Sequence, residues 1–430
     1  MCYADYRFCL VLLALTLICW LCAKKSSCIK YGIIAAVLSL AFFKYTNFFA
    51  DSFSRLFAKD DFTALKIIMP LGISFYTFSA ISYLADVHRG KVQAMPLVDV
   101  ALYISFFPKI TSGPIQRSAD FFGQISCPRN ISKDNFLSGV QIFCFGLFKK
   151  LVLSDRLSVL VDQVYQTPLA FDGITVWLAV LEYSLQIYLD FSGYSDMATG
   201  AARMLDIQLP RNFNLPYLSH NVTELWKRWH ISLSSWLQDY LYIPLGGSRK
   251  GSARAYLNLV LTMVIGGLWH GANWTFILWG TLHGVALVAH KLWVKLTKSN
   301  EKPHHLPANL LSVLVTFIFT SFCWIFFRAD SIDNAFQIIG RLFCFGSGVV
   351  HLYIWVFVSI GVLLIASLVA VLGKKERALP PKRQNQSFVN GYYPLLNLDK
   401  FWHLVLFFIF CGLIISLAYT GGSPFIYGTF

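Results

Sequence analysis

Two histidines lie in the two most unusual segments of the chain, and histidine is the side chain best suited to moving a proton near neutral pH. His270 lies within the apolar run GLWHGANWTFILWGTLHG, and no charged side chain occurs between Arg254 and Lys291. His230 lies forty residues earlier, in the tryptophan-rich run NVTELWKRWHISLSSWLQDYLYIPLGG. An ionisable group is costly to bury in so apolar a setting and usually faces a functional cavity. We therefore predict that His270 is a general base acting on a substrate hydroxyl.

Each histidine also has a structural interpretation. His270 is expected to hydrogen-bond between helices if Gly266, Gly267 and Gly271 mark a close approach of two backbones. His230 is expected to act as an amphipathic anchor if its segment is an interfacial helix. Sequence spacing alone does not separate these interpretations from catalysis.

The neighbours of His270 supply candidates for the rest of the site. On a continuous helix Asn273 and Trp274 share its face at i+3 and i+4. Trp269 and Trp274 are then expected either to line a tunnel for the acyl group or to pack between helices. His283 is expected about 20 Å further along and on the opposite face, outside the site.

Other catalytic chemistries have little support in the sequence. The chain has no His-Glu-x-x-His pair and no Gly-x-Ser-x-Gly elbow, which are typical of zinc sites and serine nucleophiles. The ten cysteines are scattered, with one close pair at Cys19 and Cys22. We expect no metal and no paired disulfides.

The elements that position these residues belong to a membrane protein. The chain of 430 residues is 56% hydrophobic and 13% charged, with a mean hydropathy of +0.57, which excludes an ordinary soluble domain. Charge-free windows such as Leu306–Phe327, Val350–Gly373 and Phe401–Phe430 are long enough to cross a bilayer. We predict an all-α polytopic fold over residues 1–430, a single domain with about ten transmembrane helices.

The net charge of +14 does not indicate nucleic-acid binding. Basic residues fall in short clusters between apolar runs, such as Lys24–Lys25, Lys149–Lys150 and Arg249–Lys250. This distribution is typical of the positive-inside rule for membrane proteins. We expect no nucleic-acid partner.

Two central segments break the pattern of plain hydrophobic spans. Residues 174–204 carry Asp190 and Asp196 and are interrupted by FSGYSD, and residues 221–247 are amphipathic. Polar or irregular backbone at membrane depth survives only where protein buries it or water reaches it. We predict re-entrant or interfacial helices around a central tunnel, with Asp190 and Asp196 pairing with Arg203 or Arg211 to hold it open.

Four long, ordered passages resemble the membrane-bound O-acyltransferases, and within them the bacterial branch of alginate, peptidoglycan and cellulose acetylation proteins. The similarity runs from about Phe42 to the C-terminal FIYGTF. The passages are MPLGISFYTFSAISYLADVHRG from Met69, YLDFSGYSDMATG from Tyr188, TELWKRWHISLSSWLQDYLYIPLGG from Thr223, and the segment around His270. Relatives usually begin with a further apolar hairpin, so an N-terminal hairpin is expected to be missing here. The ending FIYGTF is also less aromatic than the resemblance leads one to expect.

The resemblance implies that His270 is the catalytic histidine and His230 the second histidine of the bacterial branch. It also implies a channel across the inner membrane, with acetyl-CoA as the cytoplasmic acyl donor. His230, ahead of Asn273, is the expected hydrogen-bond donor to the oxyanion. Cationic side chains would bind the phosphates of the donor, unless they are only positive-inside anchors; the candidates are Lys227, Arg228, Arg249, Lys250 and Arg254.

The same resemblance implies an extracytoplasmic polysaccharide acceptor and a partner with a serine hydrolase-like (SGNH-type) active site. Three other functions stay open. A transporter or flippase would use the histidines as proton relays, a scaffold would not depend on them, and a D-alanyl transferase would take its acyl group from a carrier-protein thioester.

Overall fold

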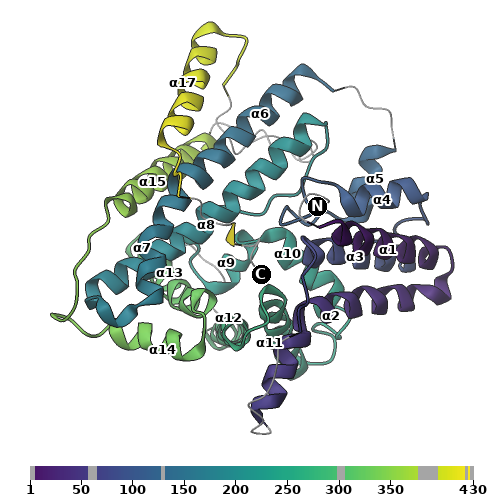
Figure 1. Cartoon of the computed structure of the whole chain (residues 1–430), viewed down its shortest axis with the longest axis horizontal. Helices are drawn as coiled ribbons and strands as arrows, with labels where there is room; N and C mark the ends of the chain where they lie inside the picture. The colour runs from purple at the N-terminus through teal and green to yellow at the C-terminus, as the bar shows by residue number, and fades with distance from the viewer. Residues whose placement is uncertain are drawn as a thin grey trace.

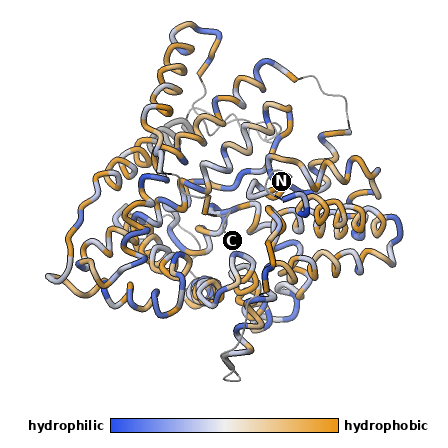
Figure 2. The backbone as a smooth tube through the Cα atoms, in the orientation of Figure 1, coloured by the Kyte–Doolittle hydropathy of each residue, from blue (hydrophilic) through white to orange (hydrophobic). Residues whose placement is uncertain are grey.

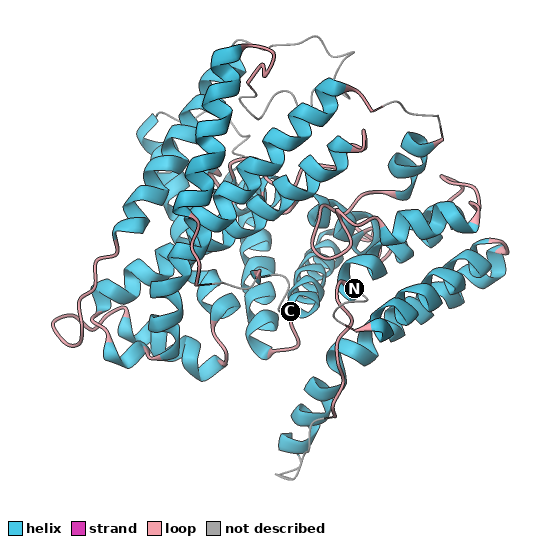
Figure 3. Ribbon diagram, turned by 45° about the horizontal axis from the view of Figure 1, so that its top comes forward, coloured by secondary structure: helices cyan, strands magenta, loops and turns pink. Residues whose placement is uncertain are grey.

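The computed structural model describes residues 5–56, 65–126, 131–297, 306–375, 396–421 and 425–426. Over these residues the regular structure is helical, and one isolated β-bridge joins Phe171 to Val349 (Figures 1 and 3). The helices are α1 (Tyr6–Ala23), α2 (Ile29–Leu56), α3 (Ile73–His88), α4 (Leu97–Ser105), α5 (Ser118–Ile125), α6 (Lys133–Leu147), α7 (Asp155–Gln166), α8 (Gly173–Met204), α9 (Val222–Arg228), α10 (Ile231–Leu237), α11 (Ser252–His270), α12 (Trp274–Thr297), α13 (Leu306–Arg328), α14 (Ile332–Arg341), α15 (Ile354–Lys375) and α17 (Phe401–Leu417). Two π-helices, η2 (Phe148–Ser154) and η5 (Gln238–Tyr242), and three short 3₁₀ helices, η1 (Ser26–Cys28), η3 (Pro168–Ala170) and η4 (Pro216–Leu218), join them.

The described helices confirm an all-α membrane protein. Six helical stretches are long and apolar enough to cross a bilayer. Most helices consist mainly of hydrophobic residues, whereas many connecting turns are hydrophilic (Figure 2). The expected number of about ten is reached only by adding the shorter or more polar helices α3, α11, α15 and α17. The six stretches are Tyr6–Ala23, Ser26–Ser54, Lys133–Gln166, Gly173–Met204, Trp274–Thr297 and Pro307–Arg328.

The central helix α8 is one unbroken helix of 32 residues, so the predicted interruption at FSGYSD is wrong. Its glycines serve close packing against α6. A Cβ atom on Gly193 would lie 2.8 Å from the Gly146 carbonyl oxygen, and one on Gly200 would lie 2.5 Å from that of Gly139. Small residues let two helix backbones meet in this way.

Polar pairs add to the same contact. Lys150 forms salt bridges of 2.7 Å to both Asp155 and Asp190, and Lys149 pairs with Asp196 at 2.5 Å. The cluster Lys149–Lys150 therefore lies inside the stretch Lys133–Gln166 and not at its end, and it fastens the π-helix η2 to α8. A π-helical turn within a longer helix frequently marks a functional site.

The second unusual segment consists of short helices and not of one long membrane-spanning helix. Residues 221–247 form the short helices α9 and α10 and the π-helix η5. His230 lies at the break between α9 and α10 with φ +42° and ψ +53°, the left-handed conformation.

Buried apolar side chains form two clusters. The first cluster comes mainly from α7, α8, α12, α13 and α14, and the second mainly from α1 to α5 with α10. Members of the first include Leu157, Ile187, Phe191, Trp229, Trp279, Trp324 and Phe327. Members of the second include Cys19, Ala36, Tyr76, Phe78, Tyr103, Phe121, Trp236 and Trp269.

Candidate functional site at the histidines

His270 is the last residue of α11 and is 3% exposed. Its ring is enclosed by aromatic rings on three sides. The ring centroids lie 4.9 Å from Trp269, 5.2 Å from Trp279 and 5.2 Å from Phe327. Trp269 belongs to the second apolar cluster, whereas Trp279 and Phe327 belong to the first. The imidazole therefore lies where the two clusters meet.

The helix ends directly after His270 because Gly271 is extended, with φ −158° and ψ +148°. A Cβ atom at Gly271 would collide with the Phe276 ring at 2.0 Å, and one at Gly267 with the Phe276 carbonyl oxygen at 2.2 Å. The predicted close backbone approach is thus present at Gly267, whereas Gly271 meets a side-chain ring and Gly266 meets the Leu237 side chain. The approach at Gly267 brings α12 back against α11.

This reversal corrects the placement of Asn273 and Trp274, which do not share a helical face with His270. The Asn273 amide donates to the Asp330 carbonyl oxygen at 2.9 Å and accepts from the Thr275 N–H at 3.0 Å. Asn273 therefore fastens the start of α12 to the loop after α13. Trp274 is 55% exposed and contacts Phe48 at 5.6 Å between ring centroids.

The same reversal corrects the placement of His283, which the sequence put far from His270. His283 is 1% exposed, and only one indole separates the two imidazoles. The Trp279 ring centroid lies 5.2 Å from that of His270 and 5.0 Å from that of His283. A continuous helix would have carried His283 away, but the turn at residues 271–273 returns it.

His230 is 1% exposed and its ring meets the Phe191 edge at 4.6 Å. Asn212 stabilises the unusual backbone at His230 with two hydrogen bonds, one through its backbone carbonyl and one through its side chain. Its carbonyl accepts from the Ile231 N–H at 2.9 Å, and its side chain accepts from Ser232 Oγ at 2.5 Å. The Asn212 amide in turn donates to Ser195 Oγ on α8 at 3.0 Å.

The two histidines belong to one packed aromatic region: Trp229, next to His230, lies 5.0 Å from Trp324, which stacks on Trp279, the ring that contacts His270. Lys44 of α2 reaches the same residue, because its Nζ lies 3.0 Å from the His270 carbonyl oxygen. Sequence reasoning missed Lys44, although a signal was present: it is the only charged residue between Lys30 and Asp51 in an apolar run. It missed Asn212 because a single asparagine in a loop has no distinguishing pattern.

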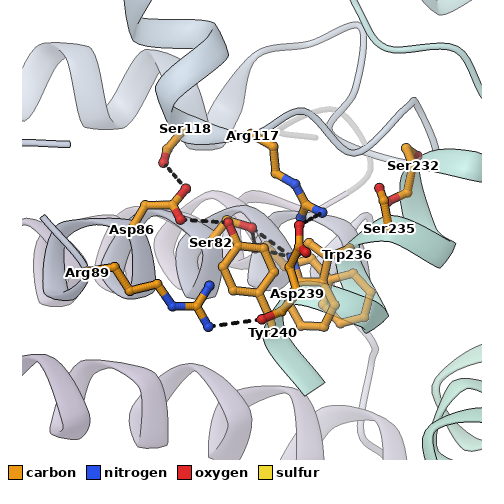
Figure 4. A network of polar contacts seen from close by, with 11 residues as sticks. Ser82, Asp86, Arg89, Arg117, Ser118, Ser232, Ser235, Trp236, Asp239 and Tyr240 are labelled. Carbon is orange, nitrogen blue, oxygen red and sulfur yellow. Dashed lines mark hydrogen bonds and ion pairs between the residues drawn. The ribbon is translucent and has the colours of Figure 1, made fainter. Parts of the chain in front are cut away.

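Trp269 connects the site to a polar network on its other side. Phe78 stacks on Trp269 at 4.8 Å and on Trp236 at 3.8 Å between ring centroids. The Trp236 indole N–H donates to Ser82 Oγ at 2.7 Å. Around it lie the hydrogen bonds of Asp86 with Ser118 and Tyr240 and the ion pair of Arg117 with Asp239 (Figure 4). These contacts fix α10 and η5 against α3.

Asp190 has a structural position, but its partner differs from the prediction. It pairs with Lys150 and accepts from the Ile426 N–H at 3.0 Å, whereas Arg203 donates to Ser138 Oγ at 2.6 Å. Arg211 donates to the Phe213 carbonyl and to Asn214 Oδ1. The partner was missed because Lys150 lies on a neighbouring helix, forty residues away in sequence.

The predicted phosphate-binding residues lie at two places. Arg228 pairs with Glu224 at 2.5 Å, one turn earlier on α9, and Lys227 beside it is exposed. Arg249 and Lys250 are exposed in the turn before α11. Because α11 has 19 residues, about 28 Å of helix separates this turn from His270.

Comparison with known proteins agrees with the sequence motifs. The sequence profile of the membrane-bound O-acyltransferase family matches residues 7–328. The chain is 41% identical to a probable alginate O-acetylase of Pseudomonas aeruginosa over 74% of this chain and 60% of the relative. It is 39% identical to a peptidoglycan O-acetyltransferase of Helicobacter pylori over 74% of this chain and 64% of the relative. A teichoic acid D-alanyltransferase of Streptococcus thermophilus is 29% identical over 57% of this chain and 65% of the relative.

The matches cover only part of each relative. The chain spans about 60% to 64% of the length of the first two relatives. The matched residues 7–328 include both histidines, and they contain the six apolar helical stretches apart from Tyr6. The profile and the helices together indicate a multi-pass protein of the bacterial inner membrane.

Proposed function

Because the chain belongs to the membrane-bound O-acyltransferase family, we propose that it moves an acetyl group from cytoplasmic acetyl-CoA toward a hydroxyl of an extracytoplasmic polysaccharide. The relatives named for alginate and peptidoglycan acetylation support this class of acceptor. The lower identity to the D-alanyltransferase supports acetyl over D-alanyl transfer. The chain spans only part of these relatives, so the donor, the acceptor and the partner all belong to the proposal.

The observation that carries the proposal is the burial of His270 and His230 in one packed aromatic region. Two imidazoles from segments forty residues apart are each at most 3% exposed, and a chain of ring contacts through Trp324 and Trp279 links their positions. An apolar side chain could fill either position, whereas burying a polar imidazole ring costs folding free energy. This arrangement supports acid–base chemistry in a site shielded from bulk water.

Acetyl transfer from a thioester to an alcohol requires two kinds of help. In the proposed mechanism His270 accepts the proton of the acceptor hydroxyl as its oxygen attacks the thioester carbonyl. His230 donates a hydrogen bond to the carbonyl oxygen while it carries negative charge. The C–S bond then breaks, and the proton on His270 passes to the departing thiolate. An ester and CoA thiol result, and the histidines return to their starting state.

The acceptor hydroxyl has three possible sources within this proposal. It belongs to a partner with a serine hydrolase-like active site, to a small carrier, or to the sugar itself. An acetyl group is much smaller than a polysaccharide, so the simplest arrangement passes only the acetyl group through the protein. A partner would then complete the transfer outside the membrane.

The test uses membrane vesicles that contain the chain, acetyl-labelled acetyl-CoA, and matched expression of two variants. We expect His270→Ala to reduce label transfer about 10²- to 10⁴-fold, because a positioned general base contributes on that order. The exposed His88 on α3 supplies the control His88→Ala, which should retain activity. The fraction that becomes labelled identifies the acceptor.

The opposite result would favour another function. Equal thioester consumption by the unaltered chain and by His270→Ala would remove His270 as the base. Movement of a labelled substrate across the vesicle without thioester cleavage would support the transporter alternative.

A further inference from the structure

The last backbone carbonyl groups of α11 accept hydrogen bonds from side chains of α2. The final four carbonyl groups of an α-helix lack partners within the helix. In α11 these are the carbonyls of residues 267–270, and His270 carries the last of them. Gly267 accepts from the Gly271 N–H at 3.4 Å. The other three carbonyls lie beside α2.

Two consecutive residues of α2 satisfy all three. Lys44 Nζ donates to the carbonyl oxygens of Trp269 at 2.5 Å and His270 at 3.0 Å. The Tyr45 hydroxyl donates to the carbonyl oxygen of Leu268 at 2.9 Å. Lys44 also lies 3.4 Å from Ser74 Oγ on α3, so one ammonium group joins three helices.

We infer that Lys44 and Tyr45 are positioning residues for His270. They fix the end of α11 at the residue that carries the imidazole, and they hold that residue against α2 and α3. A cation at a helix C-terminus is also favourable because the carbonyl end of the helix carries partial negative charge. The inference rests on the proposed role of His270 as the base.

The position matters because the chain leaves α11 in an extended conformation at Gly271. No further helical turn then follows to supply N–H donors to the last carbonyls. Without Lys44 the last turn is free to fray, and the imidazole then moves relative to His230. A misplacement of about 1 Å at a catalytic group can reduce the rate about 10²-fold.

The experiment compares Lys44→Met, Lys44→Arg and Tyr45→Phe in the vesicle assay, with acetyl-CoA varied. We expect Lys44→Met to lower kcat about 10²-fold with little change in KM for acetyl-CoA. Lys44→Arg should recover most of kcat, because a guanidinium can donate to two carbonyls at once. Tyr45→Phe should show a smaller loss, since it removes one hydrogen bond.

The exposed Lys30 on the same helix provides the matched control Lys30→Met, which should behave as the unaltered chain. If Lys44→Met matches Lys30→Met in kcat, the inference is overturned. The inference is also overturned if Lys44→Met and Lys44→Arg lose the same fraction of kcat and show the same decrease in Tm, because arginine would then give no rescue. Failure of the proposed function is distinguishable, because His270→Ala would then also retain activity.

Discussion

At the scale of single residues, the backbone at His230 is the clearest sign of a constrained site. A left-handed conformation is uncommon outside glycine, and such residues cluster at functional sites because surrounding structure must hold them there. At His230 the holding structure is Asn212, which binds both the Ile231 N–H and the Ser232 hydroxyl. Glycine would fit this backbone without strain, yet the chain has an imidazole there.

This contrast yields a prediction for His230→Gly. The variant should still fold, because the ease with which glycine adopts a positive φ offsets part of the cost of the cavity that the buried imidazole leaves. Its kcat should fall about 10²-fold, as on removal of one hydrogen-bond donor to an oxyanion. Acetyl transfer and thermal unfolding of the detergent-solubilised protein check the two parts. Unchanged kcat in a folded His230→Gly protein would remove His230 from the mechanism.

At the scale of elements, the crossing of α6 and α8 determines where much of the site lies. The helix α8 carries Phe191, which contacts His230, and Ser195, which binds Asn212. Its approach to α6 depends on glycine at both contact points, Gly146 with Gly193 and Gly139 with Gly200. No side chain fits between these backbones.

Gly193→Ala therefore tests whether this crossing holds the fold. The added methyl group would lie 2.8 Å from the Gly146 carbonyl oxygen, and overpacking of this kind costs about 1–3 kcal/mol. We expect a lower apparent Tm and lower yield of folded protein. Gly412→Ala on α17 is the matched control, because nothing lies within 4 Å of its Cβ position. There alanine should be neutral or stabilising, and similar losses in both variants would contradict the packing argument.

At the scale of the whole molecule, basic residues and the histidines lie at separate ends of α11. Arg249 and Lys250 precede the helix and His270 ends it. By the positive-inside rule we expect the basic turn to face the cytoplasm, where the proposed donor acetyl-CoA would bind. A donor bound there by its phosphates would extend its thioester toward the buried histidines.

The double variant Arg249→Gln with Lys250→Gln tests this arrangement. We expect KM for acetyl-CoA to rise about tenfold, which corresponds to about 1.4 kcal/mol, while kcat changes little. The increase should shrink at high ionic strength, because salt screens exposed charges. Lys24→Gln with Lys25→Gln, an exposed pair in the turn after α1, is the control. Equal KM values for the two double variants would show that these residues are only topological anchors.

The sequence by itself determined the class of fold, the family and the two histidines. The composition excluded a soluble domain because burial of so much apolar surface requires a membrane, and long ordered motifs identified the family. His270 was recognisable as a candidate because an ionisable ring is rarely tolerated in an apolar run, and His230 because its motif resembles that of the bacterial branch. These features depend on residue type and local spacing, which a sequence states directly.

Only the tertiary structure decided what surrounds the histidines. The turn at Gly271 sent Asn273 and Trp274 away from His270 and returned His283 toward it. Lys44 of α2 meets the last carbonyls of α11, and Lys150 meets Asp190. These contacts join residues from different helices, and they depend on helix ends and backbone approach that hydrophobic periodicity does not encode.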